Sequence, residues 1–185
     1  MVNRILCVMF ISIGHYTSAQ DQYIQPGLLA ASITYSPSVM LNHAESNFYV
    51  TGFAEYFLDE HFSFRSDTYL FLNSQNENAL IKDGARSYFG IAYHLNKGNW
   101  DGSIGFQPGL TIMNRKDSFL HPKIEPSAAL RIGTTYYVWK YFHFFANLTY
   151  TRSKLAVFER GSLATDELIL SAGLGFQIAT KRSKK

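Results

Sequence analysis

The sequence predicts an all-β protein, an eight-stranded antiparallel up-and-down transmembrane β-barrel formed by residues 20–180. Three observations lead to this fold class. The chain of 185 residues is rich in aromatic side chains (16%), but beyond its N-terminus it has no apolar run of the ~20 residues that a membrane helix needs. Apolar and polar residues alternate with a period of two. The connections between these stretches alternate between long and short, as they do in bacterial membrane barrels.

The N-terminus has the order of a secretory signal, which we assign to residues 1–19. Arg4 precedes the apolar run 5–13, and small residues end at Ala19. We expect cleavage after Ala19; the alternative is a buried N-terminal strand or helix. Cys7 is the only cysteine, so the mature chain would have no thiol for a disulfide, for catalysis or for a metal.

The alternation defines the predicted strands. In the stretch 62–72, Phe62, Phe64 and Leu70 fall on one face, while Arg65 and Asp67 fall on the other. Each predicted strand is about as long as the ~9–11 residues of a tilted membrane strand, and longer than the ~5–6 of an ordinary globular strand. The predicted strands are 27–36, 46–57, 62–73, 85–95, 101–113, 125–138, 142–152 and 167–179.

The connections predict the orientation. Long polar loops would lie outside the cell and short turns in the periplasm, together with both chain ends and a basic periplasmic tail at 181–185. Pro108 falls within a strand, where its missing N–H predicts a bulge or a local break. The predicted long loops are 37–45, 74–84, 114–124 and 153–166, and the short turns are 58–61, 96–100 and 139–141.

Alternation by itself does not say which face is inside. A soluble lipocalin-like carrier would place the apolar face inside its barrel. An eight-stranded barrel, however, has an interior only wide enough for side chains to fill it. The apolar face, rich in Phe, Leu, Ile and Tyr, is too bulky for that space, whereas the other face is rich in Gly, Ala, Ser and Thr. We therefore expect the apolar face to meet lipid.

This orientation sends several charged side chains into the lumen. A three-residue turn at 59–61 would place Glu55 directly opposite Arg65. Unpaired charges are costly in a low-dielectric interior, so we expect a network that plugs the lumen. The alternative is that the charges line a narrow wet channel. The predicted network consists of Glu55, Arg65, Asp67, Arg86 and Arg131.

The exported eight-strand pattern resembles the small outer-membrane β-barrel family, the group with OmpA-like and OmpX-like barrels. Its last strand, "GLGFQI", places Gly173, Phe176 and Ile178 at the spacing of the Gly-x-x-aromatic-x-apolar signal that the barrel assembly machinery reads in such families. The residues after Ile178 depart from that pattern. The hairpin "YFLDEHFSFRSDTYLFL" is similar to barrels of Bacteroidota-type bacteria. The resemblance implies location in the outer membrane, with its lipids and the assembly machinery as partners.

Chemistry is only weakly indicated. Some small barrels modify lipid A with His, Ser and an acidic residue, and two outer loops supply these residue types without a family spacing. The remaining histidines lack metal-ligand spacing, and His94 and His143 are predicted to be hydrogen-bonded lumen residues. We predict no cofactor and, from the net charge of +3, no nucleic-acid partner. The candidate catalytic residues are His43, Glu45, Ser46, Asp117, Ser118 and His121.

Apolar residues in the outer loops suggest a surface for a partner, unless they pack on one another or enter the outer leaflet. The resulting hypothesis is a non-enzymatic outer-membrane barrel with a structural, adhesive or surface-binding role. The alternatives are a narrow porin for small solutes, a lipid A-modifying enzyme and a soluble lipocalin-like carrier. The apolar loop residues are Val39, Met40, Ile81, Phe119, Leu120 and 155–158.

Overall fold

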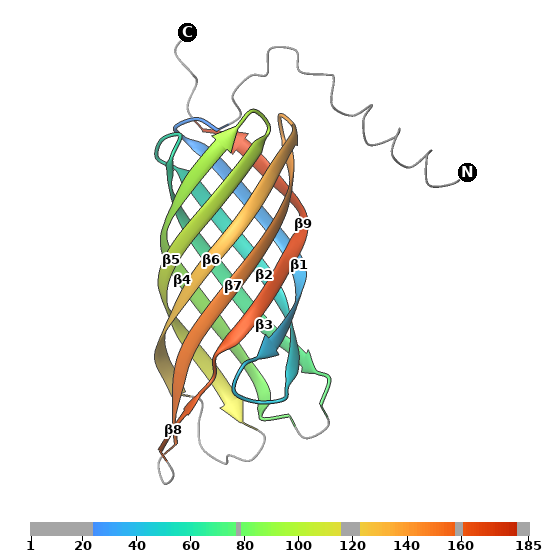
Figure 1. Ribbon diagram of the computed structural model, residues 1–185, viewed down its shortest axis with the longest axis vertical. Helices are drawn as coiled ribbons and strands as arrows, with labels where there is room; N and C mark the ends of the chain where they lie inside the picture. The colour runs from blue at the N-terminus through green and yellow to red at the C-terminus, as the bar shows by residue number, and fades with distance from the viewer. Residues whose placement is uncertain (1–23, 77–78, 116–122, 158–160, 181–185) are drawn as a thin grey trace, which may run out of the picture.

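The computed structural model describes residues 24–76, 79–115, 123–157 and 161–180. Within them the chain forms nine antiparallel strands, eight of which close into a barrel (Figure 1). The strands are β1 (Leu28–Met40), β2 (Ser46–Phe57), β3 (Phe62–Ser74), β4 (Ile81–Lys97), β5 (Trp100–Arg115), β6 (Lys123–Trp139), β7 (Phe142–Val157), β8 (Gly161–Ala164) and β9 (Glu167–Ala179).

Each barrel strand pairs with its neighbour in the chain, and β9 pairs with both β7 and β1 to close the wall. The short β8 pairs only with the end of β7 and extends it as a small hairpin. The two ends of the barrel sequence meet where the amide of Thr180 donates to the carbonyl of Gly27 at 2.8 Å. The predicted eight-stranded up-and-down barrel is therefore confirmed.

The predicted strand ends were wrong on the side of the long loops. β1 continues to Met40, β4 begins at Ile81, and β7 runs to Val157. Strands can extend beyond the apolar band of a membrane, and there their composition is as polar as that of a loop, so hydropathy does not mark their ends. The predicted signal peptide, the basic tail and loop residues 116–122 and 158–160 lie outside the described residues.

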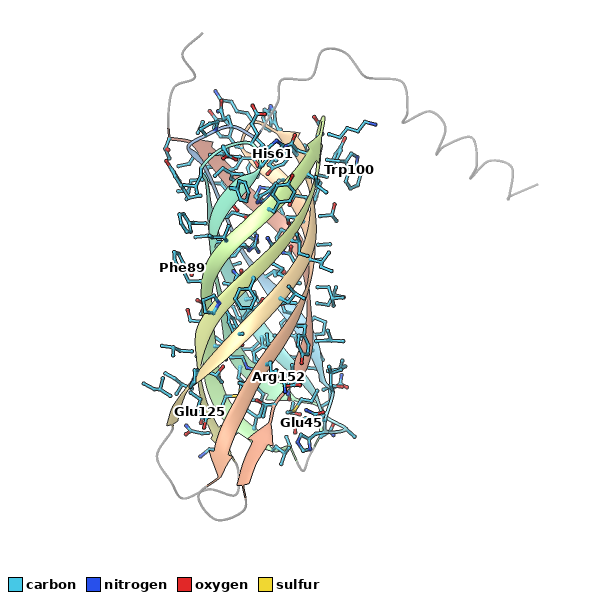
Figure 2. All side chains as sticks on the ribbon, turned by 60° about the vertical axis from the view of Figure 1, so that its left-hand side comes forward. Glu45, His61, Phe89, Trp100, Glu125 and Arg152 are labelled. Carbon is cyan, nitrogen blue, oxygen red and sulfur yellow. The ribbon has the colours of Figure 1, made fainter. Side chains whose placement is uncertain are left out.

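The two faces of the wall differ as the alternation predicts. Outward side chains are large and apolar, and Phe89 and Phe106 keep 59% and 62% of their surface exposed; Figure 2 shows Phe89 pointing away from the barrel. Inward side chains such as Tyr88 and Gln107 are buried. This is the inverse of a soluble carrier, and an apolar outer face of this kind requires lipid as its solvent. No helix among the described residues is long and apolar enough to span a membrane.

The strand pairing is interrupted at Pro108, which points outward from β5. Paired residues of β4 and β5 stop at Tyr88 and Gly109 and resume at Ile91 and Phe106, with the same register on both sides. The irregularity predicted there is thus a local break without a bulge, since no residue is inserted. On its other side Pro108 remains paired with β6.

Candidate functional site

The polar interior is the candidate functional site, and it begins at the turn between β2 and β3. The amide of Leu58 donates to the carbonyl of Phe62 at 2.8 Å, which leaves three residues in the turn. Glu55 therefore lies directly opposite Arg65 in the ladder. Arg65 Nη1 lies 2.9 Å from Glu55 Oε2, and both side chains are almost fully buried.

Arg65 also binds Asp67 through two parallel contacts. Its Nε lies 2.9 Å from Asp67 Oδ2, and its Nη2 donates to Oδ1 at 3.0 Å. The guanidinium carbon is 3.7 Å from the centroid of the Phe53 ring, in the geometry of a cation–π contact. One arginine thus bridges two carboxylates, with the fork geometry that makes such pairs strong.

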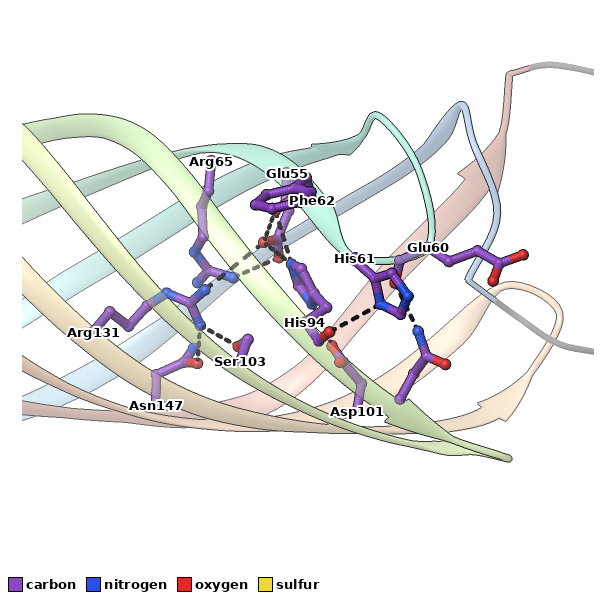
Figure 3. Close-up of polar contacts among 12 residues, drawn as sticks. Glu55, Glu60, His61, Phe62, Arg65, His94, Asp101, Ser103, Arg131 and Asn147 are labelled. Carbon is purple, nitrogen blue, oxygen red and sulfur yellow. Dashed lines mark hydrogen bonds and ion pairs between the residues drawn. The ribbon is translucent and has the colours of Figure 1, made fainter.

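His94 joins the same cluster from β4. Its Nδ1 lies 2.7 Å from Asp101 Oδ2, and its Nε2 lies 2.8 Å from Ser63 Oγ and 3.3 Å from Glu55 Oε1 (Figure 3). The histidine is therefore a hydrogen-bonded lumen residue, as predicted. His143, on β7, is likewise hydrogen-bonded, with its Nδ1 2.9 Å from Gln177 Oε1.

Arg131 approaches the cluster from the opposite wall. Its Nη1 donates to Ser103 Oγ at 3.0 Å and to Asn147 Oδ1 at 2.9 Å, while its Nη2 lies 3.8 Å from Glu55 Oε1 (Figure 3). Gly133 makes room for this contact, because a Cβ atom there would collide with Asn147 Oδ1 and would lie 2.5 Å from Arg131 Nη1. The structure thus brings four of the five predicted network residues together.

The fifth residue, Arg86, belongs to a separate cluster, so the prediction of one network was wrong. Its Nη1 lies 2.5 Å from Glu167 Oε2 and donates to Thr151 at 2.7 Å. Glu167 also accepts hydrogen bonds from Tyr49 and Asn47. The reason is the stagger of the closed barrel, which brings the outer end of β9 to the level of Arg86.

Three charged lumen residues, Asp101, Glu125 and Glu167, are missing from the predicted network. Each is the first residue of a predicted strand and shares the inward parity of its neighbours, which was the signal that could have found it. A charged residue at the end of a strand can equally belong to the preceding loop, so its residue type alone does not place it in the lumen.

An apolar cluster packs around the Arg86 pair, in which Arg86 Nη2 lies 3.6 Å from Met113 Sδ and the hydroxyl of Tyr49 donates to Glu167. Met40 and Ile81, predicted among the exposed loop residues, are buried in it, because the longer strands turn these positions inward. Val39 remains exposed. The cluster consists of Met40, Tyr49, Tyr69, Ile81, Tyr88, Met113, Ala129 and Ile169.

The candidate catalytic residues are not joined in the part of the chain that the structure describes. No hydrogen bond links the side chains of His43, Glu45 and Ser46; Glu45 instead accepts the amide of Leu80 at 2.8 Å. Asp117, Ser118 and His121 lie outside the described residues. Among the described side chains, no group of three or more His, Cys, Asp or Glu is arranged to hold a metal ion.

The proposed assembly signal lies on β9, at the seam with β1. Phe176 and Ile178 point outward, and their backbone pairs with Ala31 and Leu29. Gly173 lies on the inward face and pairs with Phe145 of β7. These positions are those of the final barrel strand; recognition by the assembly machinery stays a prediction.

No family model matches the chain, and no curated protein matches it. Solved structures do. The N-terminal β-barrel domain of OprF from Pseudomonas aeruginosa matches with a TM-score of 0.58 at 13% identity, over 84% of this chain and all of that one. The outer membrane protein OprG from the same species matches with a TM-score of 0.62 at 10% identity, over 86% and 100%.

Ail, the attachment invasion locus protein of Yersinia pestis, matches with a TM-score of 0.52 at 13% identity, over 83% of this chain and all of that one. The fold is that of the small outer-membrane β-barrels. These identities are too low to transfer a binding activity or a reaction.

Proposed function

We propose that this chain is an integral outer-membrane protein whose lumen is closed to solutes along the barrel axis, and that it acts through its outer surface instead of as a pore or an enzyme. The observation that carries the proposal is the burial of the lumen side chains. Arg86, Arg131, Tyr69 and Tyr88 each expose 1% of their surface or less. Neighbouring side chains therefore fill the lumen around them.

The charge pairing supports closure. In the cluster around Arg65, each carboxylate has a partner that holds its side chain in place: Arg65 for Glu55 and Asp67, and His94 for Asp101. Opening the axis would separate these pairs in a low-dielectric interior, which is strongly unfavourable. A surface role has a precedent in the fold, since Ail is named for attachment and invasion.

Single-channel conductance of the refolded protein in a planar bilayer tests the closure. We expect insertion without a steady open current. The double variant Glu55→Ala, Arg65→Ala removes the ion pair, leaves Asp67 with the Gln107 amide as its partner, and should give a small, steady current. A steady current from the unaltered protein would instead make it a narrow porin.

A further inference from the structure

The chain enters the barrel wall through a tight turn formed by residues 25–28. The amide of Leu28 donates to the carbonyl of Gln25 at 3.1 Å, and Gly27 has a φ of 85°. Proline at the second position of a turn and a residue with positive φ at the third are the features of a type II turn, and Pro26 and Gly27 supply them. The turn reverses the chain just before β1, so Ile24 does not continue the line of that strand.

Ile24 is buried, with 3% of its surface exposed. It packs into an apolar cluster at the end of the barrel where β1 begins and β9 ends (Figure 1). We name this end the turn-side mouth, because the turn between β2 and β3 lies there too. The other members of the cluster are Leu28, Ala30, Phe53, Phe57, Tyr137 and Phe145.

The apolar cluster separates the turn-side mouth from the charged interior. The ring of Phe57 lies 4.7 Å from the ring of His94, and the ring of Tyr137 lies 5.8 Å from that of His143, measured between centroids. Six of the seven members belong to strands of the wall, whereas Ile24 precedes β1 and belongs to none. Ile24 is therefore the part of this layer that can move without moving a strand.

Few contacts tie the segment to the wall, and they are concentrated at Gly27. Its amide donates to the carbonyl of Phe57 at 2.8 Å, and its carbonyl accepts the amide and the hydroxyl of Thr180 at 2.8 and 2.7 Å. Within the described part of the chain, no hydrogen bond joins Ile24 or Pro26 to a strand. Gly27 is thus a fixed point, and Ile24 is held by packing.

We propose that Ile24–Gly27 is a lid on the turn-side mouth, which swings out about Gly27 while all eight barrel strands stay paired, and which admits water to the layer of Ala30 and Phe57 above His94. Glycine suits such a pivot, because it adopts positive and negative φ with similar ease. Displacing the lid exposes one buried side chain and breaks no rung of the wall. Opening the wall itself would break backbone hydrogen bonds that lipid cannot replace.

This lid rests on the closed lumen proposed above, and it makes the closure at one mouth reversible. Two buried alanines serve as reporters of opening. In a Cys7→Ser background, which leaves no other thiol, Ala30→Cys places a thiol beneath the lid, and Ala129→Cys places one in the apolar cluster around the Arg86 pair. The two alanines expose 3% and 1% of their surface.

A charged methanethiosulfonate reagent, added to the protein in lipid nanodiscs, measures access to each thiol. The bilayer excludes the charged reagent, so it reaches the interior only through a mouth. Ile24→Ala removes the side chain that holds the lid and leaves every strand residue unchanged. We expect labelling of Ala30→Cys to become at least about tenfold faster in this variant, because truncation of a buried isoleucine favours the open lid. Labelling of Ala129→Cys should keep its rate.

Ile81→Ala is the matched control. It truncates an isoleucine that is 2% exposed in the cluster of Ala129, away from the lid. The rate of Ala30→Cys labelling should stay unchanged in it. An increase equal to that of Ile24→Ala would overturn the lid, since loss of any buried isoleucine would then loosen the interior.

The turn provides a second pair of variants, in which the strands are also unaltered. Gly27→Ala is strained at a φ of 85°, whereas Gly27→Asn introduces a residue that tolerates positive φ. We expect Ala30→Cys to be labelled faster in Gly27→Ala than in Gly27→Asn, with both variants folded by their heat-modified gel mobility. Equal labelling would overturn a lid that is held shut by this turn.

Failure of the lid and failure of the closed lumen give different results. An unchanged rate of Ala30→Cys labelling in Ile24→Ala, or equal acceleration of both reporters, would overturn the lid and leave the closure of the unaltered protein in place. Fast labelling of both reporters in protein with an unaltered lid would instead show a lumen open along its axis, and would overturn the closure and the lid together.

Discussion

Arg86 on β4 and Glu167 on β9 form an ion pair from which water is excluded: Nη1 and Oε2 are 2.5 Å apart, and neither side chain has accessible surface. The pair crosses the interior of the barrel between segments that are far apart in the sequence. In such surroundings the loss of one partner leaves a charge without solvation, which makes the pair a sensitive probe of the interior.

Glu167→Gln should lower the free energy of unfolding by roughly 3–5 kcal/mol, because Arg86 keeps its charge and loses its counter-ion. Urea unfolding from lipid vesicles, followed by tryptophan fluorescence, measures the change. Glu60→Gln, at an exposed position in the β2–β3 turn, is the control and should have little effect. A loss of less than ~1 kcal/mol in Glu167→Gln would mean that water solvates Arg86.

Gly133→Ala should destabilise the barrel by about 1–3 kcal/mol, the usual cost of overpacking. The added Cβ displaces the Arg131–Asn147 hydrogen bond, for which this glycine makes room. Gly102→Ala is the matched control, because its Cβ would meet nothing closer than the Leu95 carbonyl at 3.8 Å. Equal unfolding curves for the two variants would count against a tight contact at Arg131.

Ile132→Arg tests the lipid-facing wall. Ile132 lies near the middle of β6 and is 58% exposed, so a charge there should cost about 2–4 kcal/mol of folding free energy in a bilayer. Leu58→Arg places the same charge beside the β2–β3 turn at the end of the barrel, where water is available, and should be nearly neutral. Folding efficiency into vesicles, read from the heat-modified gel mobility of the barrel, compares the two. Similar losses for both would argue that the middle of β6 is not embedded in lipid.

Asp59 gives the β2–β3 turn a pH dependence. Its Oδ1 accepts the amides of His61 and Phe62, each at 2.7 Å, and these hydrogen bonds lower the pKa of the Asp59 carboxyl. Because the pKa of this carboxyl is lower in the folded than in the unfolded protein, the carboxylate stabilises the turn at pH values above the ordinary Asp pKa near 3.9. That contribution is lost as the pH falls through the folded-state pKa.

Asp59→Ala should therefore differ from the unaltered protein at pH 6 and converge with it as the pH approaches 2. Asp59→Asn keeps an acceptor oxygen but does not titrate, so its turn should hold at low pH. Hydrogen-exchange rates of the His61 and Phe62 amides between pH 2 and 6, corrected for the intrinsic rate, measure how well the turn is held at each pH. A constant difference between Asp59→Ala and the unaltered protein over that range would show that the carboxylate charge is irrelevant.

Local patterns were enough to predict the wall. Alternation assigned Arg65 and Asp67 to the lumen and Phe64 to lipid, and a three-residue turn placed Glu55 opposite Arg65, as the structure has them. These relationships depend only on strand parity and on the geometry of one hairpin. The break at Pro108 was predictable for the same reason, since it follows from a missing N–H.

The sequence by itself thus determined the number of membrane strands, the face that each residue occupies and the pairing across the tight turn, because the period of a strand and the reach of a turn are local properties. Only the tertiary structure decided that Arg86 pairs with Glu167, apart from the cluster around Arg65. Contacts across the lumen depend on how far the strands are staggered when the barrel closes. That stagger is a property of the whole sheet, and no single segment encodes it.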